Sequence, residues 1–295
     1  IVIMKLEKII NEIEKIFPTK TAEEFDNVGL LLGKTDAECN KALVCHDVTD
    51  EIIDEALNNK CQLIISYHPL IFKSLKKINY EDRIGRIITK IIENKLSLYS
   101  IHTSFDNLKN GLNFELGKIL NLENQKILIP KKNSLMKLTS YVPNGYLDIV
   151  LNSLYEAGAG EIGNYSNCSF SAKGEGRYLG SKESNPKFGN KEKLTKTSEI
   201  LINLIFPSHR KKKIIESLIN SHPYESVAYE ITKIENKNPD LGLGTIGVLP
   251  ISMTKKKFLE YLKNKLPINV LRCSRFTKNK IKIVSVLAGS GAFAI

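Results

Sequence analysis

The sequence predicts an α/β protein in which short buried strands alternate with amphipathic helices. In the first third of the chain, short apolar runs are separated by segments with helical periodicity. Strands joined through helices form parallel βαβ units with right-handed crossovers. This alternation of short apolar strands and helices stops near residue 127 and resumes near residue 237. Between these points the order strand, helix, strand pair, strand, helix, strand predicts a ferredoxin-like, split-βαβ module.

The elements of the first third follow from periodicity and from capping residues. Residues 4–16 have apolar side chains at helical spacing and stop before Pro18. The three strands predicted from apolar runs are 41–47, 61–66 and 96–101. The further helices predicted there are 49–60, with Thr49 or Asp50 as N-cap, 83–95 and 110–122.

The remaining elements are predicted in the same way. Those of the middle module are a strand and turn at 137–145, a helix at 147–158, a Gly- and Ser-rich strand pair at 164–180, a strand at 198–207, a helix at 211–222 and a strand at 226–234. The last part contains a strand at 241–250, a helix at 253–266 and a strand at 282–287. Residues 158–163 spell G-x-G-x-x-G but follow a helix, so Gly158 is predicted as a helix C-cap. Because the chain stops directly after its last strand, we expect it to be truncated.

Composition excludes several classes of protein. The chain of 295 residues is 42% hydrophobic and 25% charged, as globular proteins are. No apolar run approaches the roughly 18–20 residues that cross a bilayer, and the start lacks a signal-peptide cleavage site. The cysteines are scattered and fit reduced thiols rather than a disulfide framework: Cys39, Cys45, Cys61, Cys168 and Cys273. We therefore expect a cytoplasmic protein with no membrane partner.

The formal charge of +11 raises the question of nucleic-acid binding. Only six of the 43 basic residues are arginine, the side chain that base readers and phosphate clamps prefer. The longest lysine runs, 211–213 and 255–257, lie beside helical patterns and read as solvated faces. Nucleic acid is therefore not expected as the main partner.

Polar side chains follow three consecutive predicted strands. Asp47 follows the first strand, Tyr67 and His68 the second, and His102 the third, with Asp106 four residues later. Parallel strands present their carboxyl ends at one edge of a sheet, where ligand sites of open α/β sheets lie. Imidazole and carboxylate together suit Zn, Fe, Mn or Co, and such an ion lowers the pKa of a coordinated water toward neutrality. The pattern favours a divalent-metal site for hydrolysis.

Each of these residues also has a purely structural explanation. Asp47 and Asp106 can cap the helix that follows each of them. A histidine after a strand is often only the start of a polar loop. His46 is assigned to the strand 41–47, is expected to point away from the edge, and is interpreted as structural. Only the joint occurrence of the two histidines and Asp106 favours the metal site.

Four segments resemble the signatures of the GTP cyclohydrolase 1 type 2 homologues, also called the Nif-three-like family. They are EEFDNVGLLLG at 23–33, SYHPLIF at 66–72, IHTSFDN at 101–107 and VLAGSG at 286–291. The middle module resembles the insertion of the longer bacterial members at 155–170, 174–178 and 222–231. The resemblance covers nearly the whole chain.

The resemblance implies two similar Nif-three-like α/β lobes, the second incomplete, with an inserted ferredoxin-like, PII- or CutA-like α+β module. The expected parts are residues 1–126 for the first lobe, which carries the metal-site motifs, 127–236 for the module and 237–295 for the start of the second lobe. Members of the family are similar to one another in forming homohexameric toroids with paired divalent ions. A homo-oligomer that binds a small molecule is therefore expected.

The resemblance also assigns roles to site residues. His68 and Asp106 match family metal ligands, and His102 matches the histidine beside that site, where it would contact the ion or one of its ligands. Tyr67 stands where the family commonly has the first histidine of a pair. A later segment of the family carries a further histidine and a bridging glutamate, and this chain ends before it. A dinuclear centre is therefore expected to be incomplete here.

Two functions follow as hypotheses. The first is a divalent-metal-dependent hydrolase acting on a nucleotide-like or small phosphorylated substrate, with a metal-bound water as nucleophile and His102 as a catalytic residue that orients or shuttles a proton. The second is a ring-shaped, metal-binding regulatory or sensor protein without turnover of its own. A truncated, decaying copy is the third interpretation, favoured by Tyr67 and by the abrupt end.

Overall fold

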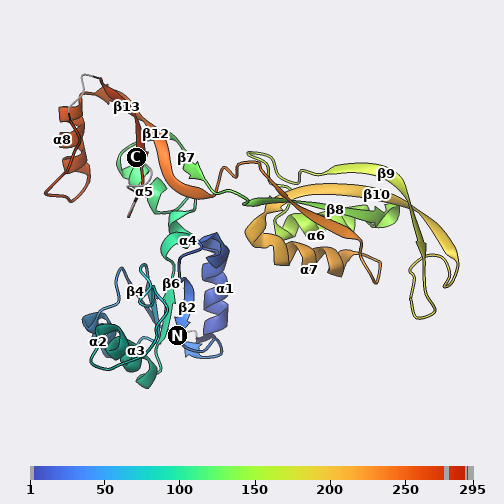
Figure 1. Ribbon diagram of the computed structural model, residues 1–295, viewed down its shortest axis with the longest axis horizontal. Coiled ribbons are helices and arrows are strands. Elements are labelled where there is room, and N and C mark those ends of the chain that lie inside the picture. The colour runs from blue at the N-terminus through green and yellow to red at the C-terminus, as the bar shows by residue number, and fades with distance from the viewer. Residues whose placement is uncertain (1–2, 276–278, 290, 292–295) are drawn as a thin grey trace. The chain divides into compact units, whose positions relative to one another are not determined.

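The computed structural model describes residues 3–275, 279–289 and 291. Within them the chain divides into two compact units (Figure 1). Unit 1 is built from the described parts of 1–129 and 240–295, and unit 2 from 130–239. Each unit is a mixed α/β structure, as the sequence predicts.

The first sheet of unit 1 has the strand order β2-β6-β5-β4. The parallel pairs β4–β5 and β5–β6 confirm the predicted βαβ units, whereas β2 runs antiparallel to β6 at the edge of the sheet. The strands are β2 (Gly29–Leu32), β4 (Ala42–Cys45), β5 (Leu63–Ser66) and β6 (Ser97–Ser100). The helices that cover the sheet are α1 (Leu6–Ile16), α2 (Asp50–Asn58) and α3 (Arg83–Glu93).

The two faces of this sheet are buried against different helices. Side chains alternate along a strand, so neighbouring residues face opposite sides. Leu63 and Tyr99 pack in the cluster that contains Leu6 of α1. Ile64 and Leu98 pack in the cluster formed with α2 and α3. Because the central strands are covered on both faces, only their ends are open to a ligand.

Unit 1 has further elements outside this sheet and its covering helices. Its elements are β1 (Met4–Lys5), η1 (Thr19–Thr21), β3 (Glu38–Cys39), α4 (His102–Asp106), α5 (Leu112–Ile119), β7 (Glu123–Pro130), β12 (Gly242–Met253), α8 (Lys255–Lys265) and β13 (Ile281–Val286). The strands β13, β12 and β7 form a second sheet in that order. The short helix α4 was not predicted, and it carries both His102 and Asp106.

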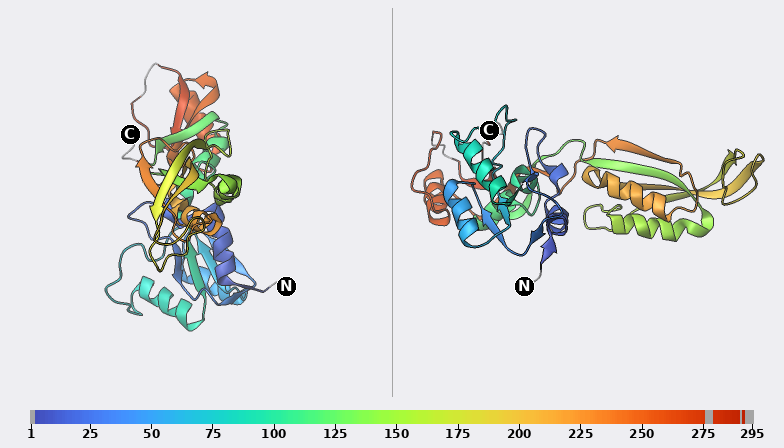
Figure 2. Two further views of the ribbon diagram at one scale, coloured as in Figure 1. Left: turned by 90° about the vertical axis from the view of Figure 1, so that its right-hand side faces the viewer. Right: turned by 90° about the horizontal axis from the view of Figure 1, so that it is seen from below.

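Unit 2 has one antiparallel sheet of order β11-β8-β10-β9. Both long helices of the unit lie on the same face of that sheet (Figures 1 and 2). Its elements are β8 (Leu135–Pro143), η2 (Asn144–Tyr146), α6 (Leu147–Ala157), β9 (Phe170–Leu179), β10 (Leu194–Pro207), η3 (Ser208–Arg210), α7 (Lys211–Ser221) and β11 (Tyr229–Ile234). The unit has its own apolar core between the sheet and the helices.

Two predictions about the middle module have different outcomes. Gly158 ends α6 with φ 97°, which confirms the predicted C-cap. The strand pair predicted at 164–180 is wrong, because residues 170–179 form one continuous strand whose partner is β10. Glycines inside that strand suggested a turn, but they stay extended in the ladder.

Three further observations complete the fold. In the part of the chain that the structure describes, no helix is both long and apolar enough to span a bilayer. The five cysteines, all described, are free thiols. The signature at 286–291 includes Ser290, which lies outside the described residues, as do residues 292–295.

Candidate metal centre

The predicted site residues lie just beyond the carboxyl ends of the three parallel strands. Asp47 follows β4, Tyr67 and His68 follow β5, and His102 begins α4 two residues after β6. The placement of His46 in a strand is wrong, because β4 ends at Cys45 and His46 lies in the same loop as Asp47. Parallel pairing of the strands brings these loops together.

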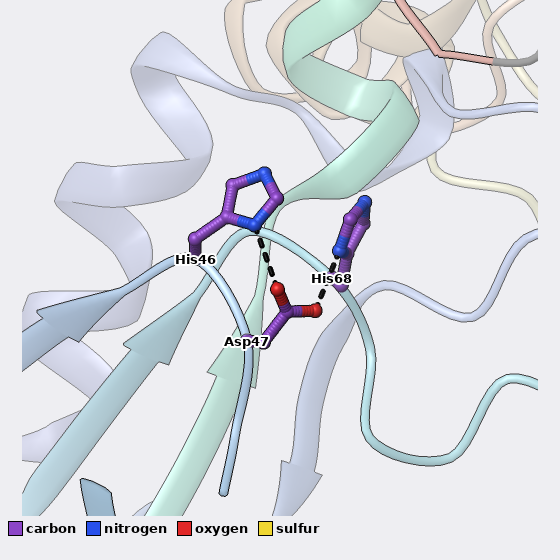
Figure 3. A group of neighbouring side chains, drawn as sticks. All are labelled: His46, Asp47 and His68. Atoms are coloured by element: carbon purple, nitrogen blue, oxygen red, sulfur yellow. Dashed lines mark hydrogen bonds and ion pairs between the residues drawn. The ribbon is translucent and has the colours of Figure 1, made fainter.

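Asp47 lies between the rings of His46 and His68. Its Oδ2 is 2.8 Å from Nδ1 of His46, and its Oδ1 is 2.8 Å from Nδ1 of His68. Figure 3 shows the carboxylate between the two rings, whose second nitrogens point away from it. These hydrogen bonds, first that of His68 and then that of His46, lower the pKa of Asp47. Asp47 is thus a carboxylate at neutral pH.

These three residues form a group with the chemistry of a metal site. One ligand atom from each lies within 4.8 Å of the others. Their side chains are 67%, 60% and 43% exposed for His46, Asp47 and His68, so other ligands can reach the group. Two imidazoles and one carboxylate suit a borderline divalent ion, and catalytic sites keep an open coordination position.

A second carboxylate holds His102. Oδ1 of the buried Asp26 is 2.8 Å from Nδ1 of His102, and Oδ2 accepts hydrogen bonds from the backbone N–H and the hydroxyl of Thr103. Burial by itself would raise the pKa of Asp26, but the hydrogen bonds from His102 and Thr103 outweigh it and lower that pKa. Asp26 is therefore ionised and fixes the orientation of the imidazole.

Asp106 is bonded to the phenol of Tyr67. The Tyr67 hydroxyl lies 2.8 and 2.9 Å from the two carboxylate oxygens and donates to them. Burial raises the pKa of Asp106, although the bond from Tyr67 lowers it in part. Burial, followed by the bond to Asp106, raises the pKa of Tyr67 above its usual value. Tyr67 is therefore a neutral donor rather than an anionic ligand.

The rings of these residues form one cluster. The Tyr67 ring centroid lies 5.1 Å from that of His46, 4.9 Å from that of His68 and 5.5 Å from that of His102. All three imidazoles have Nδ1 next to a carboxylate, and none of the described residues forms a hydrogen bond with their Nε2 atoms. For His102, the carboxylate on Nδ1 leaves Nε2 as the nitrogen that can act as a ligand or a base. An ion shared by His46, Asp47 and His68 would instead lie on the Nδ1 side of the two rings.

His102 also has an unusual backbone. Its φ is 21°, a value that side-chain-bearing residues rarely adopt. Its N–H donates to the carbonyl of Tyr67 at 3.0 Å, and its ring is held by Asp26. Strained backbone of this kind persists where the surroundings enforce it, and it clusters at functional sites.

The structure assembles some of the predicted residues more closely than others. His68, Tyr67 and His102 lie in one ring cluster, and Asp106 joins it through Tyr67. Neither Asp106 nor His102 belongs to the group of donors within 4.8 Å of one another.

Sequence reasoning missed two residues of the site. From the sequence, His46 is interpreted as structural and Asp26 is assigned no role. Asp26 lies in the segment EEFDNVGLLLG, so its place in a signature was the available signal.

The fold and the site together define a mixed α/β protein with carboxylate-held imidazoles at the ends of parallel strands. Comparison with known proteins identifies the class more closely. The chain belongs to the Duf34/NIF3 (NGG1p interacting factor 3) family, whose model matches residues 4–295.

Relatives and solved structures agree with this assignment. The chain is 36% identical to the GTP cyclohydrolase 1 type 2 homolog of Bacillus subtilis over 97% of this chain and 77% of that protein. It is also 36% identical to that of Halalkalibacterium halodurans, over 96% and 76%. The crystal structure of a Bacillus cereus protein related to NIF3 matches with a TM-score of 0.82 and 35% identity, over 98% of this chain and 77% of that chain.

Proposed function

We propose that this protein binds a divalent metal ion at His46, Asp47 and His68 and uses it to hydrolyse a nucleotide-like or small phosphorylated substrate. The observation that carries the proposal is the approach of these three donors within 4.8 Å at the end of the parallel sheet. Their chemistry fits zinc, iron, manganese or cobalt. The name of the relatives, which refers to a GTP cyclohydrolase, supports a nucleotide-like substrate.

The metal supplies one part of the chemistry: when bound, it is a Lewis acid that makes water a nucleophile near neutral pH. His102 is the proposed proton carrier, because no described residue forms a hydrogen bond with its Nε2 and its ring lies 5.3 Å from that of His68. Asp26 fixes that ring through Nδ1, so the proton that moves is the one at Nε2.

Asp106 is proposed as a further ligand. The Tyr67 hydroxyl lies within hydrogen-bond distance of both its oxygens, so an ion at Asp106 competes with that hydrogen bond for the carboxylate. Tyr67 therefore weakens this position relative to a histidine, which would itself coordinate. A single ion at the His46–Asp47–His68 group is accordingly the primary proposal.

The finer architecture is part of the same proposal. The order βαββαβ and the sheet order β11-β8-β10-β9 in unit 2 support a ferredoxin-like module. The three-part division at 1–126, 127–236 and 237–295, with a second lobe similar to the first, and the assembly into a homohexameric ring also remain proposals.

Metal titration of the full chain tests the ligand set. We expect isothermal titration with Zn²⁺ or Mn²⁺ to give one site per chain, and His46→Ala and His68→Ala to weaken it by tenfold or more. Asp47→Asn should do the same, whereas Asp36→Asn, which changes an exposed aspartate of the same unit, should leave affinity unchanged. Unaltered affinity in both histidine variants would refute the assignment.

An activity assay distinguishes the proposed hydrolase from a regulatory protein without turnover. A panel of nucleoside triphosphates and p-nitrophenyl phosphate, assayed with and without chelator, should show turnover that the chelator removes. His102→Ala is expected to lower the rate by about 100-fold with metal content retained, as loss of a general acid–base does. Asp26→Asn should also lower the rate, by at least tenfold, with metal content retained. Metal binding without chelator-sensitive turnover on any substrate would favour the regulatory alternative.

A further inference from the structure

Unit 2 contains a cavity that the proposed metal chemistry does not use. Its volume is about 640 Å³, and it is lined by residues of β9 and β10 together with the loops at 184–187 and 224–228. Cavities that hold small organic ligands commonly measure about 300–1,000 Å³. The cavity lies wholly within unit 2.

A buried carboxylate lines this cavity. Glu199 of β10 is only 8% exposed. Its Oε1 accepts hydrogen bonds from the Tyr224 hydroxyl at 2.7 Å and the Thr197 hydroxyl at 2.9 Å. Among the described residues, none donates a hydrogen bond to Oε2. Oε2 therefore keeps free acceptor capacity at the cavity wall, and a ligand that donates a hydrogen bond can use it.

The neighbouring strand leaves room for that oxygen. A Cβ on Gly176 of β9 would lie 2.3 Å from Oε2 of Glu199, so a larger residue here would force this carboxylate to move. Glycine in the middle of a strand costs stability, so its presence here needs a local reason. The close approach of the carboxylate to the β9 backbone supplies that reason.

Aromatic side chains form part of the wall. The rings of Tyr178 and Tyr224 lie 6.0 Å apart at 66°, and both line the cavity. Tyr178 is fixed by a hydrogen bond from its hydroxyl to the carbonyl of Phe188. Aromatic faces favour cations and flat rings.

The other charged side chains of the lining are exposed to solvent, and its other two glutamates have partners. Glu175 pairs with Arg177 at 2.8 Å, and Glu225 accepts a hydrogen bond from the backbone N–H of Asn185 at 2.8 Å. The lysines of the lining are exposed and can extend into solvent. Glu199 is therefore the buried charge that a ligand meets inside.

We propose that this cavity binds a small organic molecule in which an amidinium, guanidinium or ammonium group is attached to an aromatic or apolar body. The charged group donates to Oε2 of Glu199, and the body packs against Tyr178 and Tyr224. A carboxylate oxygen only accepts hydrogen bonds, and a charged donor gives the stronger bond. The site is independent of the metal and extends the role of the protein to recognition of a second molecule.

Benzamidine is a probe with this chemistry, and the full chain can be titrated with it by NMR chemical-shift perturbation. We expect a Kd of about 1 mM for so small a ligand, with shifts in β9 and β10. Benzoate, which has the same ring but the opposite charge, should bind at least tenfold more weakly. No benzamidine binding up to about 10 mM, or equal binding of benzoate, would overturn the proposal without any variant.

Two glutamate variants locate the binding. Glu199→Gln keeps the shape of the side chain but removes its charge, and it should lower the affinity for benzamidine by tenfold or more. Glu175→Gln changes a second lining glutamate, whose side chain is half exposed and paired with Arg177, and it should alter the Kd by less than twofold. Circular dichroism checks that both variants are folded. Equal affinity of folded Glu199→Gln and wild type would exclude Glu199 as the acceptor.

Discussion

The histidines of this chain show how the partner of an imidazole decides its role. His46, His68 and His102 each have Nδ1 beside a carboxylate, which fixes the orientation of the ring. His222 of unit 2 is different. Its Nε2 donates to the carbonyl of Tyr141 at 3.0 Å, and its Nδ1 accepts from the N–H of Tyr224. It is only 7% exposed.

This environment makes the stability of unit 2 depend on pH. Burial lowers the pKa of His222, although the bond to Tyr141 and the charge of Glu199 oppose the shift. The folded protein therefore binds the proton less well than the unfolded chain, whose histidine pKa is about 6.5. Stability is complete above that pH and is lost as the pH falls toward the folded value.

His222→Gln tests this pH dependence. The glutamine amide can donate to Tyr141 but does not titrate. When the pH is lowered from 7 to 5, the unfolding free energy of the variant should therefore rise relative to that of the wild type. Urea unfolding followed by circular dichroism at the two pH values measures the difference. A difference that stays constant, or changes in the opposite direction, would contradict the assignment.

At the scale of the element, the start of α2 positions the metal-site loop. Thr49 is the N-cap, and its hydroxyl accepts a hydrogen bond from the N–H of Ile52 at 3.4 Å. Only three residues separate Cys45, the end of β4, from this cap, and two of them are His46 and Asp47. A fixed helix start therefore restricts the path of the loop that carries both donors.

Removal of this cap should be measurable. Thr49→Ala is expected to lower the unfolding free energy of unit 1 by about 1 kcal/mol, because an N–H of the first turn loses its acceptor. Thr49→Ser keeps the hydroxyl and should stay close to wild type. Urea unfolding of the three proteins provides the comparison, and equal midpoints for wild type and Thr49→Ala would show that the cap contributes nothing.

Much of this element structure was predictable from the sequence. The helix from Leu6 to Ile16 and the three parallel strands follow from local periodicity, which a single sequence displays directly. The single strand β9 was not predictable, because its glycines serve a contact with Glu199, which lies 23 residues later than Gly176. The site shows the same division. Strand ends indicated Asp47, His68 and His102, but Asp26, the carboxylate partner of His102, comes from a distant segment that meets the site only in space.

At the scale of the whole molecule, unit 2 interrupts two neighbouring strands. The chain leaves unit 1 after β7 and returns to it in β12, and these strands are adjacent in the second sheet. The Thr245 hydroxyl lies 3.2 Å from Oε1 of Gln125 and 3.2 Å from the carbonyl oxygen of Lys126, which shows how closely the strands approach. The two ends of the insertion could therefore be joined by a short turn.

This arrangement predicts that unit 1 is separable. Replacement of residues 131–239 by an Asn-Gly turn should leave a folded protein, because unit 1 retains its apolar cores. Its affinity for Zn²⁺ should lie within threefold of that of the full chain. Titration calorimetry and circular dichroism test both expectations. A protein that does not unfold cooperatively would show that unit 1 requires the insertion.

The residue just before the metal-site loop has a practical consequence for labelling. Cys45 ends β4, and burial, followed by the charges of Asp47 and Glu55, raises the pKa of its thiol to about 11. Maleimides react with thiolate, so this sulfur is a poor target at neutral pH. Cys273 is exposed and offers an attachment point for a fluorescent dye. A reporter placed there leaves the sulfur beside His46 unmodified.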